Sequence, residues 1–265
     1  MINLNILTRV DSTIDDVTKY VIEDDTFGKN EVSIIRKSDK IIFCVPTQTN
    51  CKMGRTFCHL TGTTRKAKNL TAEWIDSVVD CLVEAEQIHL YPVDLLISFM
   101  GVGEPLLNVS NLMGVVEILH DKYPDIRFGV STMTPNIRAI NKLTDWLLAN
   151  PDYRVKVHLS VHGIFNRDSI VKTPVSIEMA IKHLQTYHKL TDQPIEYHYT
   201  LVDGVNDSVD ELKAFNSLIE HDGATVKFLT LSETNGCKAT KLTEEEITIT
   251  FPKNIVEFYD PPGEM

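Results

Sequence analysis

Three of the chain's five cysteines lie within fifteen positions, in the stretch CVPTQTNCKMGRTFCHLTG. These are Cys44, Cys51 and Cys58. Thiolates grouped in one loop are typical of sites that bind a metal ion or an iron–sulfur cluster, or that carry out redox chemistry. An odd number of cysteines argues against a framework of structural disulfides. The stretch therefore predicts a sulfur-based site, in which Arg55 stands where a further ligand is expected.

Two kinds of segment alternate along the chain and must position this loop. Short runs rich in Val, Ile, Leu and Phe predict buried strands, at residues 40–45, 93–100, 126–132, 154–161, 194–202 and 224–231. Amphipathic segments with apolar residues at helical spacing lie between them, at residues 71–88, 108–123, 135–150, 176–190 and 208–223. Thr71 is a candidate N-cap for the first helix. The alternation predicts an α/β fold with a parallel sheet.

Unusual polar residues follow the predicted strands, in the loops TQTNC, GVGEP, STMTP, SVHG, LVDGVND and SETNG. In parallel α/β folds the functional site forms at the carboxyl ends of the strands. Six strand–helix units are too few for a closed eight-stranded barrel. We therefore expect a partial (β/α)6 barrel over residues 40–236, with its site at one end.

Two further segments flank the predicted barrel. Residues 1–39 are expected to form a small N-terminal β extension, with strands at 17–24 and 31–37 that lead antiparallel into the first barrel strand. Residues 237–265 are expected to form a C-terminal tail that contains one short strand, in NIVEFYD. The sequence thus predicts one barrel domain with a small addition at each end.

The composition is that of a folded globular chain, with 43% hydrophobic and 24% charged residues. A net charge of -11 argues against extensive contacts with nucleic-acid phosphates, unless a local basic patch provides them. No apolar run reaches the length of a membrane span, and the N-terminus lacks the pattern of a signal peptide. We therefore expect a cytoplasmic protein with no membrane partner.

Five motifs in a fixed order resemble those of a known family. CVPTQTNCKMGRTFC, GVGEPLLN, VSTMTP, LSVHG and LVDGVNDS are similar, in this order, to motifs of the adenine carbon-2 RNA methyltransferases, the RlmN/Cfr family of the radical S-adenosylmethionine (radical SAM) superfamily. The likeness runs from about residue 17 to about residue 236. It implies a radical-SAM-type barrel, S-adenosylmethionine, a [4Fe–4S] cluster, a ribosomal or transfer RNA substrate, and an electron donor such as flavodoxin. It leaves the oligomeric state open.

The resemblance also implies cofactor-binding residues. Cys51 and Cys58 match the first and third cluster ligands. Gly103 and Glu104 match a pair that binds S-adenosylmethionine, and a carboxylate facing its ammonium group is electrostatically favourable. Further contacts with this cofactor are implied for Ser131, Ser160, Val161, His162 and Ser232.

Two matched residues have catalytic roles in the family. Glu31 matches a proposed proton acceptor, and Cys44 matches a cysteine that resolves a covalent RNA intermediate. Ser232 stands in the place of a family asparagine, for which Asn235 is a substitute candidate. The resemblance therefore implies acid–base and thiol chemistry beside the cofactors.

The chain departs from the family pattern in three ways, one of which is that no segment matches the family's N-terminal RNA-binding domain. Arg55 replaces the second cluster cysteine, and a guanidinium, which stays protonated, is a poor ligand for iron. No cysteine matches the C-terminal family residue that carries the methyl group. The leading hypothesis is a radical SAM enzyme that acts on an RNA adenine or a related substrate. The alternatives are a non-catalytic S-adenosylmethionine-binding protein without a cluster, and a cluster-free activity in which Arg55 takes part.

Other candidate residues have simpler interpretations. Cys81 is expected to be a buried structural thiol on a helix. Cys237 is expected to be a surface thiol, the alternatives being a substitute cluster ligand or methyl carrier. His59 is expected to be a solvated loop residue, and TEEEI a solvated acidic run. No role is assigned to His158, His183, His188 and His198.

Overall fold

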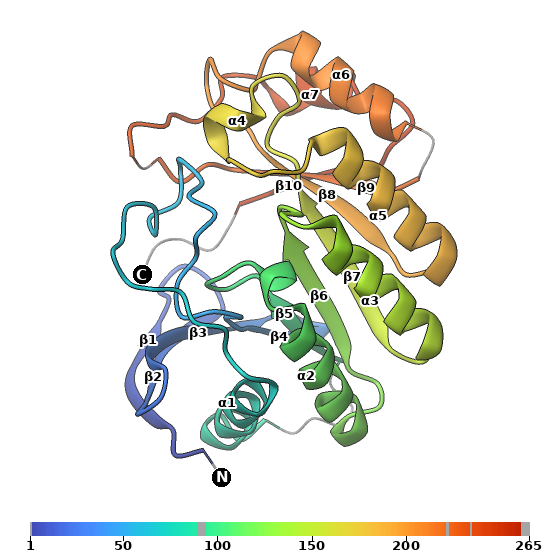
Figure 1. Cartoon of the computed structure of the whole chain (residues 1–265). Helices are drawn as coiled ribbons and strands as arrows, with labels where there is room; N and C mark the ends of the chain where they lie inside the picture. Colours follow the sequence, from blue (N-terminus) through green and yellow to red (C-terminus); the bar gives the residue numbers. More distant parts are fainter. Residues whose placement is uncertain (1, 89–93, 221–222, 234, 261–265) are drawn as a thin grey trace.

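The computed structural model describes residues 2–88, 94–220, 223–233 and 235–260. Its ten strands form one sheet, in which the spatial order follows the chain from β1 to β10 (Figure 1). The sheet has two edges, β1 and β10, so the barrel is open rather than closed. This confirms the predicted partial barrel with a β extension.

The N-terminal part of the sheet is antiparallel. It consists of β1 (Asn5–Asp11), β2 (Val17–Asp24) and β3 (Gly28–Arg36), and β3 pairs antiparallel with β4 (Lys40–Cys44). The two predicted strands and their antiparallel entry are confirmed, whereas β1 was missed. Every residue of β1 is exposed, so this edge strand lacks the buried face that gives a strand its apolar alternation.

From β4 onward the sheet is parallel. The further strands are β5 (Asp94–Phe99), β6 (Arg127–Thr132), β7 (Arg154–Ser160), β8 (Ile195–Thr200), β9 (Thr225–Leu229) and β10 (Val256–Tyr259). The six predicted barrel strands are confirmed. The short strand predicted in the tail is β10, which adds a seventh parallel strand beside β9. Residues 261–265 of the predicted tail, and residue 93 of the predicted second strand, lie outside the described residues.

Helices follow the parallel strands and lie along the outside of the curved sheet (Figure 1). They are α1 (Ala72–Ala85), the 3-10 helix η1 (Pro105–Leu107), α2 (Val109–Lys122), α3 (Ile137–Ala149), α4 (Arg167–Ile170), α5 (Ile177–Thr191), α6 (Val209–Ile219) and α7 (Glu244–Thr248). Thr71 is the N-cap of α1 as predicted, because its side chain accepts a hydrogen bond from the Trp74 backbone N–H.

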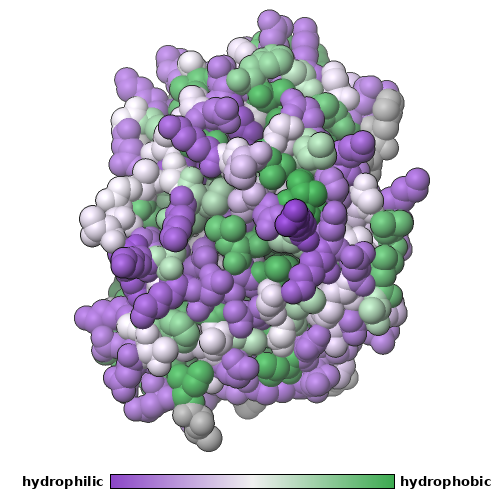
Figure 2. All heavy atoms as spheres, in the orientation of Figure 1, coloured by the Kyte–Doolittle hydropathy of each residue, from purple (hydrophilic) through white to green (hydrophobic). Residues whose placement is uncertain are grey.

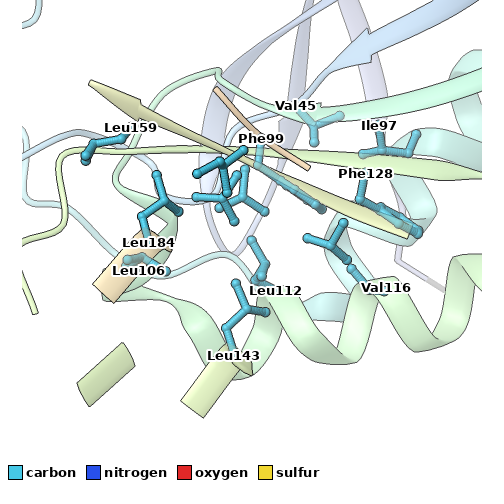
Figure 3. Packing of buried hydrophobic residues seen from close by; sticks show 14 of the residues in the cluster. Val45, Ile97, Phe99, Leu106, Leu112, Val116, Phe128, Leu143, Leu159 and Leu184 are labelled. Atoms are coloured by element: carbon cyan, nitrogen blue, oxygen red, sulfur yellow. The ribbon is translucent and has the colours of Figure 1, made fainter. Parts of the chain in front are cut away.

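The hydrophobic core fills the space between the helices and the outer face of the sheet. Figure 3 shows Val45, Ile97 and Leu159 of the sheet side packed toward Leu112 and Leu143 of the helices. Apolar residues on these strands alternate with polar ones, because successive side chains of a strand point to opposite faces. The core therefore fixes the strands, while their polar residues face the interior of the barrel.

The two faces of β8 show this division clearly, because all six of its residues are buried. Tyr197 and Tyr199 contact Phe215 of α6 through their rings, with centroid distances of 5.7 and 5.5 Å. The intervening Glu196 and His198 lie on the other face and bond each other. A strand that is buried on both faces thus presents an aromatic side to the helices and a charged side to the barrel interior.

The surface is consistent with the absence of a predicted membrane span. Among the described residues, no helix has the length and apolar character needed to cross a bilayer. The face shown in Figure 2 is mostly hydrophilic, and its hydrophobic groups are small and separated. The boundaries predicted after residues 39 and 236 stay a prediction, and the sheet continues across both, through β3–β4 and β9–β10 pairing.

The acidic run TEEEI begins α7, so it is more than a solvated loop. Thr243 accepts a hydrogen bond from the Glu246 backbone N–H, and the Glu246 carboxylate accepts one from the Thr243 backbone N–H, which forms a capping box. The three glutamates lie in the first turn, where the helix dipole favours negative charge. Through α7 the chain reaches β10.

We expect Thr243→Ala to lower the free energy of unfolding by about 1 kcal/mol, because the cap hydrogen bond is lost. The free energy is measured by urea unfolding, followed by circular dichroism. Thr243→Ser keeps the hydroxyl and serves as the control, for which we expect a stability close to that of the wild type. Equal stabilities for all three proteins would contradict the role assigned to this cap.

Candidate functional site

We call the end of the barrel where the parallel strands have their carboxyl ends the mouth. Glu104 lies there, after β5, and is fully buried. Its carboxylate accepts hydrogen bonds from the backbone N–H of Leu106 at 3.1 Å, from that of Met133 at 3.0 Å, and from the Thr132 hydroxyl. Its own backbone N–H donates to the Gln48 side-chain oxygen at 3.0 Å. Glu104 therefore joins segments that follow β4, β5 and β6, the first through its backbone and the other two through its carboxylate.

The setting of Glu104 suits it to bind a cation. Burial raises its pKa, while the three hydrogen bonds and the cation of Arg55 act in the opposite direction. Donors that hold both carboxylate oxygens fix its orientation, and a carboxylate held in this way can accept strong hydrogen bonds from a ligand ammonium group. The predicted role of Glu104 toward S-adenosylmethionine stays a prediction that this geometry supports.

Gly103 allows the loop before Glu104 to lie against the loop after β4. Its φ angle is +115°, a conformation that side-chain-bearing residues rarely adopt. A Cβ atom there would lie 2.7 Å from the Thr47 hydroxyl oxygen and 2.8 Å from the Gln48 backbone nitrogen. Glycine is therefore required at position 103 by backbone conformation and by space.

The loop after β4 brings Cys51, Cys58 and Arg55 to the same mouth. Both cysteines are half-buried, and their thiols are close enough to affect each other electrostatically. Burial raises the pKa of Cys51, and the Met53 backbone N–H and the Arg55 cation oppose that shift. Arg55 also acts on Glu104, so its charge lies inside the site rather than turned away from it.

The donor set of this loop does not fit a [4Fe–4S] cluster held by three of its own thiolates. Such clusters are ligated by cysteine thiolates. Residues 51–58 supply two thiolates and, between them, a guanidinium that cannot lose its proton. We derive no chemical step through a cluster for this chain.

His162 presents a hydrogen-bond donor near Arg55. Its Nδ1 accepts a hydrogen bond from the Thr200 backbone N–H at 3.1 Å, which leaves the proton of the neutral ring on Nε2. That Nε2 is buried without a partner among the described residues. Burial and the cations of Arg55 and Arg167 lower the pKa of His162, so the ring stays neutral. The Phe57 ring lies edge-on to it, with centroids 5.1 Å apart.

Cys237 is not the isolated surface thiol that we expected. It is half-buried, packs in an apolar cluster with Phe57, and lies with its sulfur 4.0 Å from the Thr56 hydroxyl oxygen. The nearby Asn235 amide donates to the backbone oxygens of Thr56 and Cys58 at 3.0 and 3.2 Å. The loop after β9 is therefore bound to the cysteine loop.

Glu31 and Cys44 lie on neighbouring strands of the sheet, while their predicted catalytic roles stay predictions. The register of β3 and β4 pairs Ser33 with Cys44, and Glu31 lies two residues further along the same face. The pKa of Cys44 is raised to about 11, mainly by burial and to a smaller extent by the charge of Glu31. The Lys19 ammonium lies 3.4 Å from the Glu31 carboxylate. Glu31 also lines a cavity of about 270 Å³ together with Arg65.

The other predicted cofactor contacts lie at strand ends of the mouth. Ser131 and Ser160 are on β6 and β7, with Ser160 buried, and Val161 donates its backbone N–H to the His198 oxygen at 2.9 Å. Ser232 is exposed in the loop after β9. These residues thus lie at or after the ends of three strands, β6, β7 and β9, while their roles toward a cofactor stay predictions.

Arg167 is a structural residue of the mouth that the sequence did not reveal. It is buried, and its guanidinium donates to the backbone oxygens of Val161 at 2.9 Å and of Met133 and Ser160 at 3.2 Å. It therefore joins the ends of β6 and β7. Arg167 is the first residue of the short helix α4, and its sequence context carries no pattern that indicates this role.

A second missed group lies on the interior face of the barrel. His158, Glu196 and His198 place possible ligand atoms within 4.8 Å of one another. Glu196, however, already accepts from His198 at 2.6 Å and from the ammonium groups of Lys227, at 3.1 Å, and Lys156. Because two ammonium ions repel a metal dication, we interpret the group as an internal ion-pair network. The signal was present, since polar residues alternate with apolar or aromatic ones along β7 and β8.

Comparison with solved structures shows the fold of radical SAM proteins. A radical SAM methyltransferase from Sphaerobacter thermophilus superposes with a TM-score of 0.80 at 24% identity, covering 98% of this chain and 78% of the other. Streptococcus suis SuiB bound to S-adenosylmethionine superposes with a TM-score of 0.57 at 13% identity, covering 83% and 51%. At these identities the likeness concerns the fold, which confirms the radical-SAM-type barrel.

Sequence comparison decides the family. The dual-specificity RNA methyltransferase RlmN of Geotalea uraniireducens is 30% identical over 244 residues, which cover 90% of this chain and 68% of the relative. The chain belongs to the RlmN family. A probable RlmN of Finegoldia magna is 28% identical and shares 87% of this chain and 65% of its own length. The chain thus spans about two thirds of the length of these RlmN relatives, and no model of a known protein family matches it.

The first prediction for this RlmN-family site concerns Gly103. We expect Gly103→Ala to destabilise the fold by more than the cost of a left-handed alanine alone, which is about 1–2 kcal/mol, because the new methyl group would also collide with residues 47 and 48. Gly54→Ala is the matched control, since Gly54 has a φ of +60° but open space around its Cβ position. Urea unfolding measures both, and equal losses would contradict the packing argument.

The second prediction concerns the ion-pair network on the interior face. We expect Glu196→Gln to lower the free energy of unfolding at pH 7 by about 3 kcal/mol, because two lysines lose their buried partner. Burial alone would raise the pKa of Glu196, but the bonds from His198 and Lys156 outweigh it and hold that pKa well below its usual range. The network's contribution to the free energy of unfolding is therefore complete above pH 4.5, the ordinary pKa of a glutamate. It is lost progressively as the pH falls below that value.

The measurement is the difference in unfolding free energy between the wild type and Glu196→Gln, from pH 7 to pH 3. We expect this difference to shrink as the pH falls below about 4.5. Glu257→Gln is the control, because Glu257 pairs with the same Lys227 but is half exposed. A difference that does not change with pH would refute the ionised state assigned to Glu196.

Proposed function

We propose that the protein binds S-adenosylmethionine at the mouth of its barrel and acts on RNA, as a radical SAM-type member of the RlmN family. The observation that carries the proposal is the buried Glu104 carboxylate, which donors from the loops after β5 and β6 hold in one orientation. An amino-acid ammonium group is the partner that this carboxylate fits best. When bound, S-adenosylmethionine supplies an activated methyl group on a sulfonium centre.

An RNA substrate is supported by the family and by the charge of one loop. The relatives named above are RNA methyltransferases. Residues 40–72 contain no Asp or Glu in a chain of net charge -11, and Lys52, Arg65, Lys66 and Lys68 of this segment are exposed. This segment carries the local excess of positive charge that binding to phosphates requires. We propose ribosomal or transfer RNA as the substrate class, which places the activity in the cytoplasm.

Glu31 and Cys44 are the proposed catalytic residues. Because the Cys44 thiol has a pKa of about 11, it is protonated near neutral pH and needs a base to become a nucleophile. Glu31 is the carboxylate nearest along the same face of the sheet and is therefore the proposed base. An electron donor such as flavodoxin belongs only to a form of the protein that holds a cluster.

Arg55 favours a second candidate function, that of a non-catalytic S-adenosylmethionine-binding protein without a cluster. Such a protein would keep the residues that bind S-adenosylmethionine at the mouth but would lack the radical chemistry of the family. The same residue is compatible with the first candidate only if a further thiolate comes from outside the loop. Cys237 is the cysteine that the described structure places beside residues 56–58.

The two candidates differ in iron content. We expect Arg55→Cys to approach four irons per chain after anaerobic reconstitution, because it restores a third thiolate. The wild type should hold about four irons if the first candidate is correct and far fewer if the second is correct. Iron, sulfide and the visible absorption spectrum are measured for both proteins. An oxygen-sensitive cluster of about four irons in the wild type would establish the radical enzyme and exclude the second candidate.

Binding of S-adenosylmethionine tests the part that both candidates share. We expect the wild type to bind it in a calorimetric titration, and Glu104→Gln to weaken binding by roughly tenfold or more, because a charged hydrogen bond is lost. Glu84→Gln, on the exposed face of α1, is the control. A wild type that binds no S-adenosylmethionine, with or without iron, would refute the proposed function.

A further inference from the structure

Arg55 brings a positive charge into the candidate site. Within the described part of the chain its guanidinium forms no ion pair or side-chain hydrogen bond, and it lies over the Phe57 ring, 5.5 Å from the ring centre. The side chain is half-buried. A guanidinium offers five N–H donors in a planar fork that matches the two oxygens of a carboxylate. Its donors are therefore free for a ligand.

A thiol, a carboxyl group and an imidazole from three strand ends lie near this cation. It acts electrostatically on Cys51 after β4, on Glu104 after β5 and on His162 after β7. No salt bridge joins Arg55 and Glu104 within the described residues. The loop of Arg55 nevertheless lies beside Glu104, because its Met53 packs with Met133, whose backbone N–H donates to the Glu104 carboxylate. The mouth thus presents the oriented Glu104 carboxyl group and, across a gap, a guanidinium that has no ion-pair partner among the described residues.

His162 adds a neutral donor to the positive side of this gap. Its Nε2–H is buried without a partner, and the Thr200 backbone N–H fixes which nitrogen carries the proton. Phe57 contacts both residues, since the Arg55 guanidinium lies over its ring and the His162 ring lies at its edge. A buried donor without a partner is costly unless a ligand accepts its hydrogen bond.

An α-amino acid group matches this arrangement. It carries an ammonium and a carboxylate on neighbouring atoms, and the gap offers a carboxylate for the first and a guanidinium for the second. A bidentate pair between guanidinium and carboxylate is among the strongest and most directional contacts in proteins. Arg55 replaces a cluster cysteine in the sequence, so the cation lies where the loop would otherwise supply a third thiolate.

We propose that Arg55 binds the α-carboxylate of S-adenosylmethionine, so that the amino-acid end of the cofactor is held between Glu104 and Arg55 without a cluster. This inference rests on the proposed function, since it takes Glu104 as the ammonium site. It assigns Arg55 a binding role, so that the loss of a cluster ligand is also the gain of a cofactor ligand. His162 Nε2–H is the additional donor available to the same carboxylate.

The test compares two ligands that differ only in the carboxylate. Dissociation constants of S-adenosylmethionine and of decarboxylated S-adenosylmethionine are measured by calorimetry on the full chain, freed of iron by a chelator and checked for iron content. For the wild type we expect S-adenosylmethionine to bind roughly 10-fold to 100-fold more tightly, the effect of one charged hydrogen-bonded pair. Arg55→Met should remove most of this preference, and Arg55→Lys should retain part of it.

Two control variants separate this inference from the proposed function. Arg154→Met, at the start of β7 and exposed, should leave both dissociation constants unchanged. Glu104→Gln should weaken both ligands, because both carry the ammonium group. S-adenosylhomocysteine, which keeps the amino-acid end but lacks the sulfonium charge, should show the same loss in Arg55→Met. Thermal unfolding of each variant shows that it is folded.

Three outcomes would decide against the inference. If Arg55→Met keeps the full preference for the carboxylate while Glu104→Gln weakens both ligands, the role of Arg55 is refuted and the proposed function stands. If the preference exists only in iron-loaded wild type and disappears with the iron, a metal centre holds the carboxylate instead. If the folded wild type binds neither ligand, the inference and the proposed function both fail.

Discussion

The Glu104 carboxylate is the contact on which the mouth of this barrel depends. A carboxyl group with no exposed surface is costly unless donors surround it. Here the donors come from η1 and from the loop after β6, and the backbone of Glu104 is bonded to Gln48 after β4. These bonds also require the backbone at Gly103 to lie against residues 47 and 48, where a Cβ atom would collide. Three strand ends are thereby fixed relative to one another before any ligand arrives.

The inner and outer faces of the barrel differ in the polarity of their side chains. The outer face of each strand packs against helices through apolar and aromatic side chains, as Figure 3 shows for the core around Phe99 and Phe128. The inner face carries charges, and around Glu196 these are paired among themselves. A polar interior keeps the concave face available for charged ligands, at the expense of a network whose members depend on one another.

The sequence revealed features that rest on local patterns and missed those that rest on long-range proximity. The six barrel strands, five long helices and the GVGEP loop were predictable, because hydrophobic periodicity and motif order are local signals. The edge strand β1 was missed because all of its residues are exposed. Cys237 was misplaced because its neighbour Thr56 is 181 positions away in the chain. Arg167 bonds backbone oxygens, which leave no mark on the sequence.

The hydrogen bonds from Asn235 to the cysteine loop have a consequence for dynamics. Two loops that follow the first and the sixth parallel strands are tied at Thr56 and Cys58, although neither belongs to a helix or strand. A ligand that immobilises one of them reduces the conformational entropy that remains to be lost when the other becomes ordered. Two ligands that each contact one of these loops would then be thermodynamically coupled without any movement of the sheet.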